Sequence, residues 1–144
     1  MQSRQPGGPG EVVERWDRVF AALSAEPRRQ IVTELMDVAP GEAVSLPEAG
    51  TNPALETEPE RLQTQLHHHH LPVLADAGLV QWERDPFRAY RGRDFEEVTI
   101  VLESLYANVD AMPDRLVRGC RRLEREREQE RDDDGGSSGY GVKG

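Results

Sequence analysis

The segment from Leu66 to Tyr90 constrains the fold of this chain more than any other. Its first part has apolar residues at helical spacings and predicts a helix that ends at Gly78. Two short segments with apolar and aromatic residues follow, Leu79–Trp82 and Phe87–Arg91. They predict a hairpin whose bend contains Asp85-Pro86. This order of elements predicts a helix presented beside a two-stranded flap.

Apolar spacings predict further helices before this point, so that the helices ahead of the hairpin lie at residues 11–23, 27–37, 45–49 and 59–77. Ser24 and Ser45 stand at capping positions, and Arg28 and Arg29 fall on the polar side of the second helix. Pro72 is expected to kink the last helix or to mark a joint in it, because proline has no backbone N–H. The whole arrangement predicts a mainly α fold with a small β-hairpin wing, a winged helix-turn-helix.

A heptad-like seam follows the hairpin. Apolar residues recur at alternating spacings of three and four, at Phe95, Val98, Leu102, Leu105, Val109, Met112 and Leu116. The pattern predicts a long C-terminal dimerisation helix that packs against a second copy of the chain. A helix docked on its own domain remains the alternative. Pro113 leaves open whether one kinked helix or two helices form here.

The domain organisation follows from these patterns. We expect a disordered tail over 1–10, a winged helix-turn-helix domain over 11–93, a C-terminal helix or helix pair over 94–131, and a disordered tail over 132–144. Both tails are rich in glycine, serine or proline and bury too little apolar surface to offset the entropy of ordering. Trp16, Trp82 and Phe87 are expected to pack in the core or the wing.

The charge balance is strongly acidic. The net charge is −9, with 27 acidic residues against 18 basic ones, and Lys143 is the only lysine. Such a composition resembles that of proteins from salt-loving archaea, whose cytoplasm contains molar salt, although a GC-rich genome explains the arginine bias equally well. The single cysteine, Cys120, excludes an internal disulfide and fits a reducing compartment. No apolar run approaches the ~20 residues that span a bilayer, so we expect a cytoplasmic protein without a membrane partner.

Two blocks of the sequence resemble a known family. Leu23-Ser24-Ala25-Glu26-Pro27-Arg28 stands where arsenical-repressor-type (ArsR-like) winged-helix proteins carry a leucine-serine-x-x-x-arginine signature. The block His70-Leu71-Pro72-Val73-Leu74-Ala75-Asp76-Ala77-Gly78-Leu79-Val80 is similar to the end of that family's recognition helix. The resemblance covers residues 19–91 and is closer still to a haloarchaeal group of winged-helix proteins.

The resemblance implies a sequence-specific DNA-binding transcription regulator. It implies that the helix over 59–77 enters the major groove of double-stranded DNA and that the wing over 79–91 contacts the backbone. The resemblance and the arginines of the wing together indicate these DNA-binding residues: Arg61, Gln63, Thr64, Gln65, His68, His69, Arg84, Arg88 and Arg91. A homodimer would place two recognition helices about one duplex turn apart.

Alternatives remain open because the segment around the start of this helix is acidic, with Glu56, Glu58 and Glu60 against Arg61. A protein that neutralises about four phosphates loses between roughly four and five decades of affinity over a ~20-fold rise in salt. In molar salt, direct contacts to bases must therefore carry more of the binding than positive charge does. The alternatives are a winged-helix protein-interaction module without DNA binding and a metal- or ligand-responsive repressor.

The histidine run from His67 to His70 suggests a metal site less strongly than it suggests packing. His67 and His70 have the spacing of a helical pair, but no second cluster of histidine or cysteine supplies the remaining ligands of a zinc or copper site. We expect a half-buried His70, exposed His68 and His69, and no metal or other cofactor. The chain has no phosphate loop, nucleophile elbow or paired catalytic carboxylates, so we do not expect an enzyme.

Overall fold

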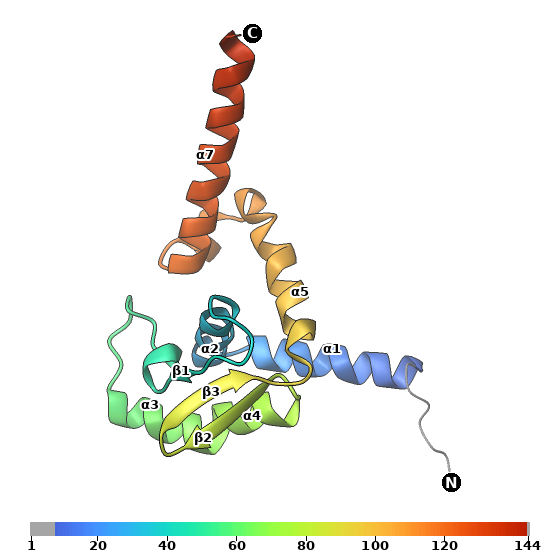
Figure 1. Ribbon diagram of the computed structural model, residues 1–144, viewed down its shortest axis with the longest axis vertical. Coiled ribbons are helices and arrows are strands. Elements are labelled where there is room, and N and C mark those ends of the chain that lie inside the picture. The colour runs from blue at the N-terminus through green and yellow to red at the C-terminus, as the bar shows by residue number, and fades with distance from the viewer. Residues whose placement is uncertain (1–7, 144) are drawn as a thin grey trace. The chain divides into compact units, whose positions relative to one another are not determined.

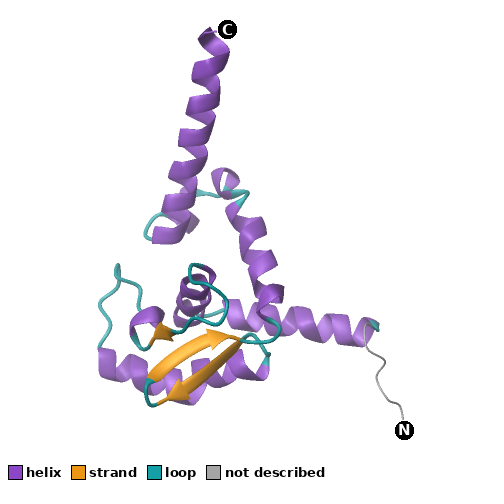
Figure 2. Cartoon of the chain, in the orientation of Figure 1, coloured by secondary structure: helices purple, strands orange, loops and turns teal. Residues whose placement is uncertain are grey.

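The structure is a computed structural model that describes the backbone of residues 8–143 and the side chains up to residue 133. The chain divides after Thr99 into two units. The described residues are mainly helical, with one small antiparallel sheet (Figure 2). The predicted class, mainly α with a small β element, is therefore confirmed at this level.

The first unit contains most of the predicted elements (Figure 1). In chain order these are α1 (Pro9–Leu23), α2 (Glu26–Met36), β1 (Val44–Ser45), the 3-10 turn η1 (Glu48–Gly50), α3 (Pro59–Gln65), the π turn η2 (Leu66–His70), α4 (Leu71–Asp76), β2 (Val80–Arg84), β3 (Phe87–Arg91) and the start of α5 (Phe95–Tyr106). The first two helices and the hairpin lie where the sequence predicts them. The predicted helix over 59–77 is present as α3, η2 and α4 in succession.

The sheet has one strand more than predicted. Its order is β1-β3-β2, and Ala89 in β3 pairs with Trp82 on one side and with Val44 on the other. The short helix expected over 45–49 was wrong at its start, because Ser45 lies in β1 and only residues 48–50 form a helical turn. The Leu46 N–H donates to the Phe87 carbonyl at 3.0 Å, so β1 exists through pairing with a strand that lies far along the chain.

The core of this unit lies between α2, the helix over residues 59–76 and the hairpin. Its fully buried large side chains are Ile31, Val32, Leu35, Leu66, Leu71, Leu74, Leu79 and Val80. Each such aliphatic side chain contributes about 1.5–3 kcal/mol when it leaves water. This packing fixes one face of the 59–76 helix and leaves the other face to solvent.

Gly78 ends α4 as the sequence predicts. Its φ is +75°, a left-handed conformation that favours glycine. A Cβ at this position would also lie 2.5 Å from a carboxylate oxygen of Asp94. The glycine therefore sets the direction in which the chain leaves the helix and enters β2.

The second unit consists of several helices rather than one. After α5 come the 3-10 turn η3 (Val109–Ala111), α6 (Asp114–Val117) and α7 (Arg121–Lys143). Buried Arg127 on α7 donates to the Asp114 carboxylate at 2.7 Å, and to the carbonyls of Val109 and Met112 at 2.9 and 2.6 Å. One side chain thus joins α7 to both short elements. Pro113 and Gly119, which has a φ of +89°, lie at the breaks between the elements.

The apolar seam is not one continuous stripe, and its part in dimerisation stays a prediction. Four of its residues, Phe95, Val98, Leu102 and Val109, are buried in the chain itself, and Met112 is half-buried. Only Leu105 and Leu116 are exposed. The heptad spacing does not give one apolar stripe here because the helix breaks twice along it.

The two predicted tails differ from the expectation in the residues that the structure describes. Residues 1–7 of the first tail lie outside the described residues, whereas Pro9 and Gly10 already belong to α1. Residues 132–143 continue α7 instead of forming an irregular tail. Within the described part of the chain, none of the helices has the length and apolarity that crossing a bilayer requires.

Candidate functional site

The candidate site is the helix–hairpin surface, which combines the polar side of residues 59–76 with the hairpin β2–β3. Six of the predicted site residues lie on the helix and all are exposed: Arg61, Gln63, Thr64, Gln65, His68 and His69. On the opposite side, Leu62, Leu66, Leu71 and Leu74 are buried. The helix is thus held by its apolar face, and its polar face is accessible over both the α3 and the η2 segments.

A π turn stands in the middle of this helix. The Leu71 N–H donates to the Leu66 carbonyl, five residues back instead of four. Pro72 follows directly, and a proline inside an α-helix clashes with the carbonyl four residues earlier, here that of His68. The wider turn relieves this crowding. The joint that the sequence predicts near Pro72 is therefore present, in the form of a π turn.

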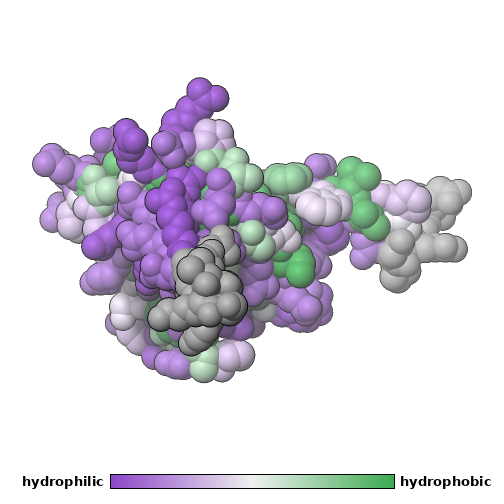
Figure 3. All heavy atoms as spheres, turned by 90° about the horizontal axis from the view of Figure 1, so that it is seen from above, coloured by the Kyte–Doolittle hydropathy of each residue, from purple (hydrophilic) through white to green (hydrophobic). Residues whose placement is uncertain are grey.

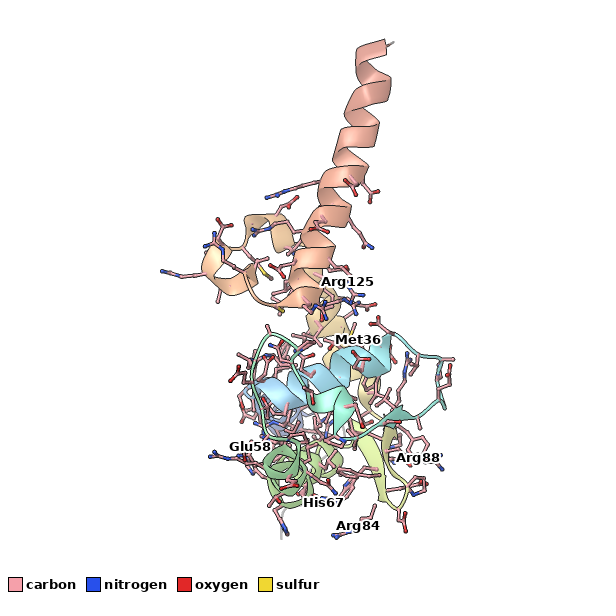
Figure 4. The ribbon with its side chains drawn as sticks, turned by 90° about the vertical axis from the view of Figure 1, so that its left-hand side faces the viewer. Met36, Glu58, His67, Arg84, Arg88 and Arg125 are labelled. Atoms are coloured by element: carbon pink, nitrogen blue, oxygen red, sulfur yellow. The ribbon has the colours of Figure 1, made fainter. Side chains whose placement is uncertain are left out.

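His67 connects the helix to the hairpin. Its ring stacks on Phe87 with centroids 4.3 Å apart and an interplanar angle of 8°, and it meets the edge of Trp82 at 5.5 Å. In Figure 4, His67 lies between the helix and the hairpin. The expected wing packing of Trp82 and Phe87 is thus confirmed, and the aromatic cluster fixes the hairpin against the helix.

His70 connects the same helix to the end of α1 through Arg28. Arg28 was expected on a polar face, but it is only 5% exposed. Its guanidinium donates to His70 Nδ1 at 2.9 Å, to Ser24 Oγ at 2.9 Å and to the Ala21 carbonyl at 2.8 Å. Because arginine only donates, Nδ1 accepts and the ring proton of neutral His70 resides on Nε2.

The contact with Arg28 and the burial of the ring both disfavour a charged His70. Burial, then the charge of Arg28, and then His69 lower the pKa of His70 to about 4. Burial also lowers the pKa of Arg28, which nonetheless remains protonated at neutral pH. The pair is therefore a buried cation with a neutral imidazole acceptor. Sequence patterns identify both residues but not this contact, which spans 42 positions.

The hairpin offers less free positive charge than its arginines suggest. Arg88 Nε donates to Glu83 Oε1 at 2.7 Å, a hydrogen bond that lowers the pKa of Glu83 and raises that of Arg88. Arg84 is exposed near the bend and lies over the Trp82 ring at 5.4 Å. Figure 4 shows Arg84 at the end of the hairpin and Arg88 along its side.

Arg91 makes structural contacts that the sequence pattern does not predict. Its guanidinium donates to the carbonyls of Leu35 and Val38, at 3.1 and 2.8 Å, and lies over the Phe95 ring. These contacts hold the end of α2 to β3. Arg91 is half-buried and already bonded, which gives it a structural part, and its contact with DNA stays a prediction.

The start of α3 is acidic and exposed. Glu56, Glu58 and Glu60 precede Arg61, and all four side chains are open to solvent. Figure 4 shows Glu58 at this end of the helix. Any polyanion that approaches the helix–hairpin surface therefore meets negative charge at the helix start and positive charge at Arg61 and Arg84.

A second surface is apolar and lies on α1. Val12, Val13, Trp16 and Phe20 are 47%, 59%, 51% and 58% exposed, and the rings of Trp16 and Phe20 stack at 5.6 Å. The expected core position of Trp16 was wrong. Figure 3 shows hydrophobic side chains on the surface of the arm that α1 forms. Contiguous apolar surface of this kind usually marks a place where another macromolecule packs.

A charged cavity of about 520 Å³ lies on another side of α1. Its lining is Glu11, Glu14, Arg15, Arg18, Arg93, Asp94 and Glu97. Arg15 donates to Glu97 at 2.7 Å and to the Ala77 carbonyl at 2.8 Å, so it ties α1 to the end of α4 and the start of α5. The lining has four carboxylates and three guanidinium groups, so charges of both signs meet here.

His67 and His70, the two histidines at helical spacing, contact different parts of the chain. His67 faces the hairpin and His70 faces Arg28, so each ring has a separate contact. Among residues 8–133, no three histidine, cysteine or acidic side chains are grouped so as to hold a metal ion. Cys120 is free and half-buried.

Comparison with protein families gives one match. Residues 20–87 are similar to a family described as "Domain of unknown function (DUF7344)". The matched range runs from the end of α1 to the start of β3 and includes both Arg28 and His70. No curated protein and no solved structure matches the chain.

Proposed function

We propose that this chain is a sequence-specific DNA-binding transcription regulator with a winged helix-turn-helix. In this proposal the helix over 59–76 enters the major groove and the hairpin β2–β3 is the wing on the DNA backbone. The observation that carries the proposal is the exposed polar side of a helix whose other face is buried. A rigid helix with glutamine, arginine and histidine on its open side offers the donors and acceptors that read base edges.

The contact between the two resembling blocks supports the proposal. The leucine-serine-x-x-x-arginine block ends at Arg28, and the recognition-helix block begins at His70, and these side chains are hydrogen-bonded. The two blocks that resemble the ArsR-like family are therefore in contact. This is expected if they serve one purpose, which is to set the orientation of the recognition helix.

The acidic surface is compatible with DNA binding if the protein works at high salt concentration. With Arg88 paired to Glu83 and Arg91 bonded to carbonyls, Arg61 and Arg84 are the main exposed cations of the helix–hairpin surface. Electrostatic attraction to phosphates is then small, and the salt dependence of binding is shallow. A haloarchaeal cytoplasm, where salt screens phosphate attraction for every protein, is the setting we propose.

The central test compares two kinds of contact. Arg61→Ala and Gln65→Ala are each expected to lose about 1–3 kcal/mol of discrimination between the preferred sequence and its mismatches, because they remove contacts to base edges. Arg84→Ala is expected to weaken all sequences alike, because it removes a backbone contact. Fluorescence anisotropy with genomic fragments in about 2–3 M KCl measures both effects.

Glu34→Ala provides the control, since this exposed residue lies on α2 outside the helix–hairpin surface. The affinity of the Glu34→Ala variant for DNA, and its discrimination between preferred and mismatched sequences, should equal those of the parent protein. Discrimination that survives in both helix variants would contradict the assignment of this helix to the major groove. Absence of any binding by the parent protein would instead favour a protein-interaction module that retains the winged fold.

We also propose that the regulator is a homodimer and that α1 supplies the contact. The predicted seam on residues 95–116 is mostly buried, whereas α1 exposes a stripe of Val12, Trp16 and Phe20 at intervals of four residues. Interface cores are rich in aromatic residues, and a pair of protomers is what places two recognition helices on successive major grooves.

Trp16→Arg combined with Phe20→Glu is expected to convert the dimer to monomer, because both charges would be buried at the contact. Light scattering after size exclusion at fixed salt measures the mass. Leu105→Glu combined with Leu116→Arg, on the exposed seam positions, is the matched control and should leave the mass unchanged. A dimeric α1 variant together with a monomeric Leu105/Leu116 variant would place the dimer contact on the C-terminal segment instead.

A further inference from the structure

The segment between Leu66 and Leu71, the four histidines His67–His70, is one residue too long for a regular α-helix that places both leucines on one face. Leu66 and Leu71 are five positions apart and both are fully buried. In an α-helix successive residues are about 100° apart, so these two side chains would point about 140° from one another. The π turn absorbs one residue and brings both leucines to the same buried face.

Pro72 holds this turn open independently of the leucines. If the π turn closed to a regular helix, the proline ring would meet the carbonyl four residues earlier. Two unrelated constraints, the burial of Leu66 and Leu71 and the shape of Pro72, therefore favour the same irregular turn. Because two separate constraints favour it, we expect the π turn to persist in the folded chain.

The additional residue lies in the exposed middle of the histidine run. His67 and His70, at the ends of the run, contact the hairpin and Arg28. His68 and His69 between them are exposed, beside the polar side chains of α3. The two anchoring histidines would keep their directions if one of the middle pair were removed, because closing the turn rotates the helix back by one residue.

We propose that the surplus residue serves DNA recognition, by presenting His68 and His69 together as donors and acceptors at the centre of the reading helix. The inference rests on the proposed function. Each neutral imidazole offers one donor and one acceptor, so an adjacent pair can contact two neighbouring base or phosphate groups. Pro72 is then a positioning residue, which sets the rotation between α3 and α4 without touching DNA.

The test removes one histidine, and deletion of any one of the four yields the same sequence. Combined with Pro72→Ala, this deletion is expected to retain the helical circular-dichroism signal and a cooperative thermal transition, since the leucines stay in register. The deletion alone should unfold at lower temperature, because Pro72 then lies in a regular helix. Deletion of Ala75, in the same helix but outside the π turn, is the matched control and should abolish cooperative unfolding.

DNA binding supplies the second readout. The folded deletion variant and the full-length His68→Ala/His69→Ala variant should each lose at least about tenfold of the discrimination between preferred and mismatched sequences. Discrimination equal to that of the parent protein in either variant would overturn the proposal. So would a deletion that stays unfolded in the presence of Pro72→Ala, because the residue would then not be surplus.

The two proposals fail in different ways. If the parent protein binds no DNA, the proposed function fails and the recognition role of the histidine pair fails with it. The unfolding measurements on the deletion variants would still decide whether the helix contains a surplus residue. If the parent protein binds with discrimination and the histidine variants match it, only the inference about the histidines is overturned.

Discussion

Replacement of Arg28 by methionine is expected to lower the free energy of unfolding by about 2–4 kcal/mol. Methionine has a similar reach, but it leaves the buried His70 Nδ1 without its donor, whereas the exposed Ala21 carbonyl still accepts from the N–H and the hydroxyl of Ser24. A buried acceptor left unpaired costs about 1–3 kcal/mol, and the lost hydrogen bonds of the charged guanidinium add to this cost. Urea unfolding at constant KCl concentration measures the change as a lower midpoint with an unchanged slope.

Arg61→Met is the matched control for this experiment, because Arg61 is an exposed arginine on a helix of the same unit. Its free energy of unfolding should stay within about 0.5 kcal/mol of the parent protein. If Arg28→Met were as mild as this control, the Arg28 guanidinium would not be what joins α1 to the helix over 59–76. DNA binding by the folded fraction of Arg28→Met should also weaken, since the orientation of the helix depends on this contact.

The second large effect is a loss of stability at mildly acidic pH. The pKa of His70 is lowered to about 4 in the folded chain, against about 6.5 in the unfolded chain, because burial and Arg28 disfavour the imidazolium. The unfolded chain therefore binds this proton more tightly. The contribution of His70 is complete above about pH 6.5 and falls as the pH drops toward about 4, by about 2–3 kcal/mol in total.

His70→Asn isolates this contribution from the titration of carboxylates and of the other histidines. The asparagine side-chain oxygen replaces Nδ1 as an acceptor for Arg28, and the amide does not titrate. Unfolding free energies measured between about pH 7 and pH 4 should therefore fall more steeply for the parent protein than for the variant. Parallel curves would contradict a buried, neutral His70.

Local patterns in the sequence predict much of the first unit. Helical spacing identifies α1, α2 and the 59–76 helix, and Gly78 marks the helix end because its left-handed φ favours glycine. The exposure of Arg61, Gln65, His68 and His69 follows from the same spacing. These features depend on residues a few positions apart, and such residues are neighbours in any helix.

Other features depend on partners that lie far along the chain. The two residues of β1 form a strand only because β3 is beside them, and no propensity identifies so short a segment. The break of the C-terminal segment at Pro113 and Gly119 leaves a heptad spacing without a continuous helix. Spacing describes which residues share a face only while the helix continues.

The sequence by itself determined where the helix over 59–76 and the hairpin lie and which residues of that helix face water, because those properties follow from local periodicity. Only the tertiary structure decided that Arg28 is buried against His70 and that Arg91 is bonded to the end of α2. A charged side chain enters a core when acceptors from distant segments converge on it. That convergence is a property of packing, which the order of residues along a helix does not reveal.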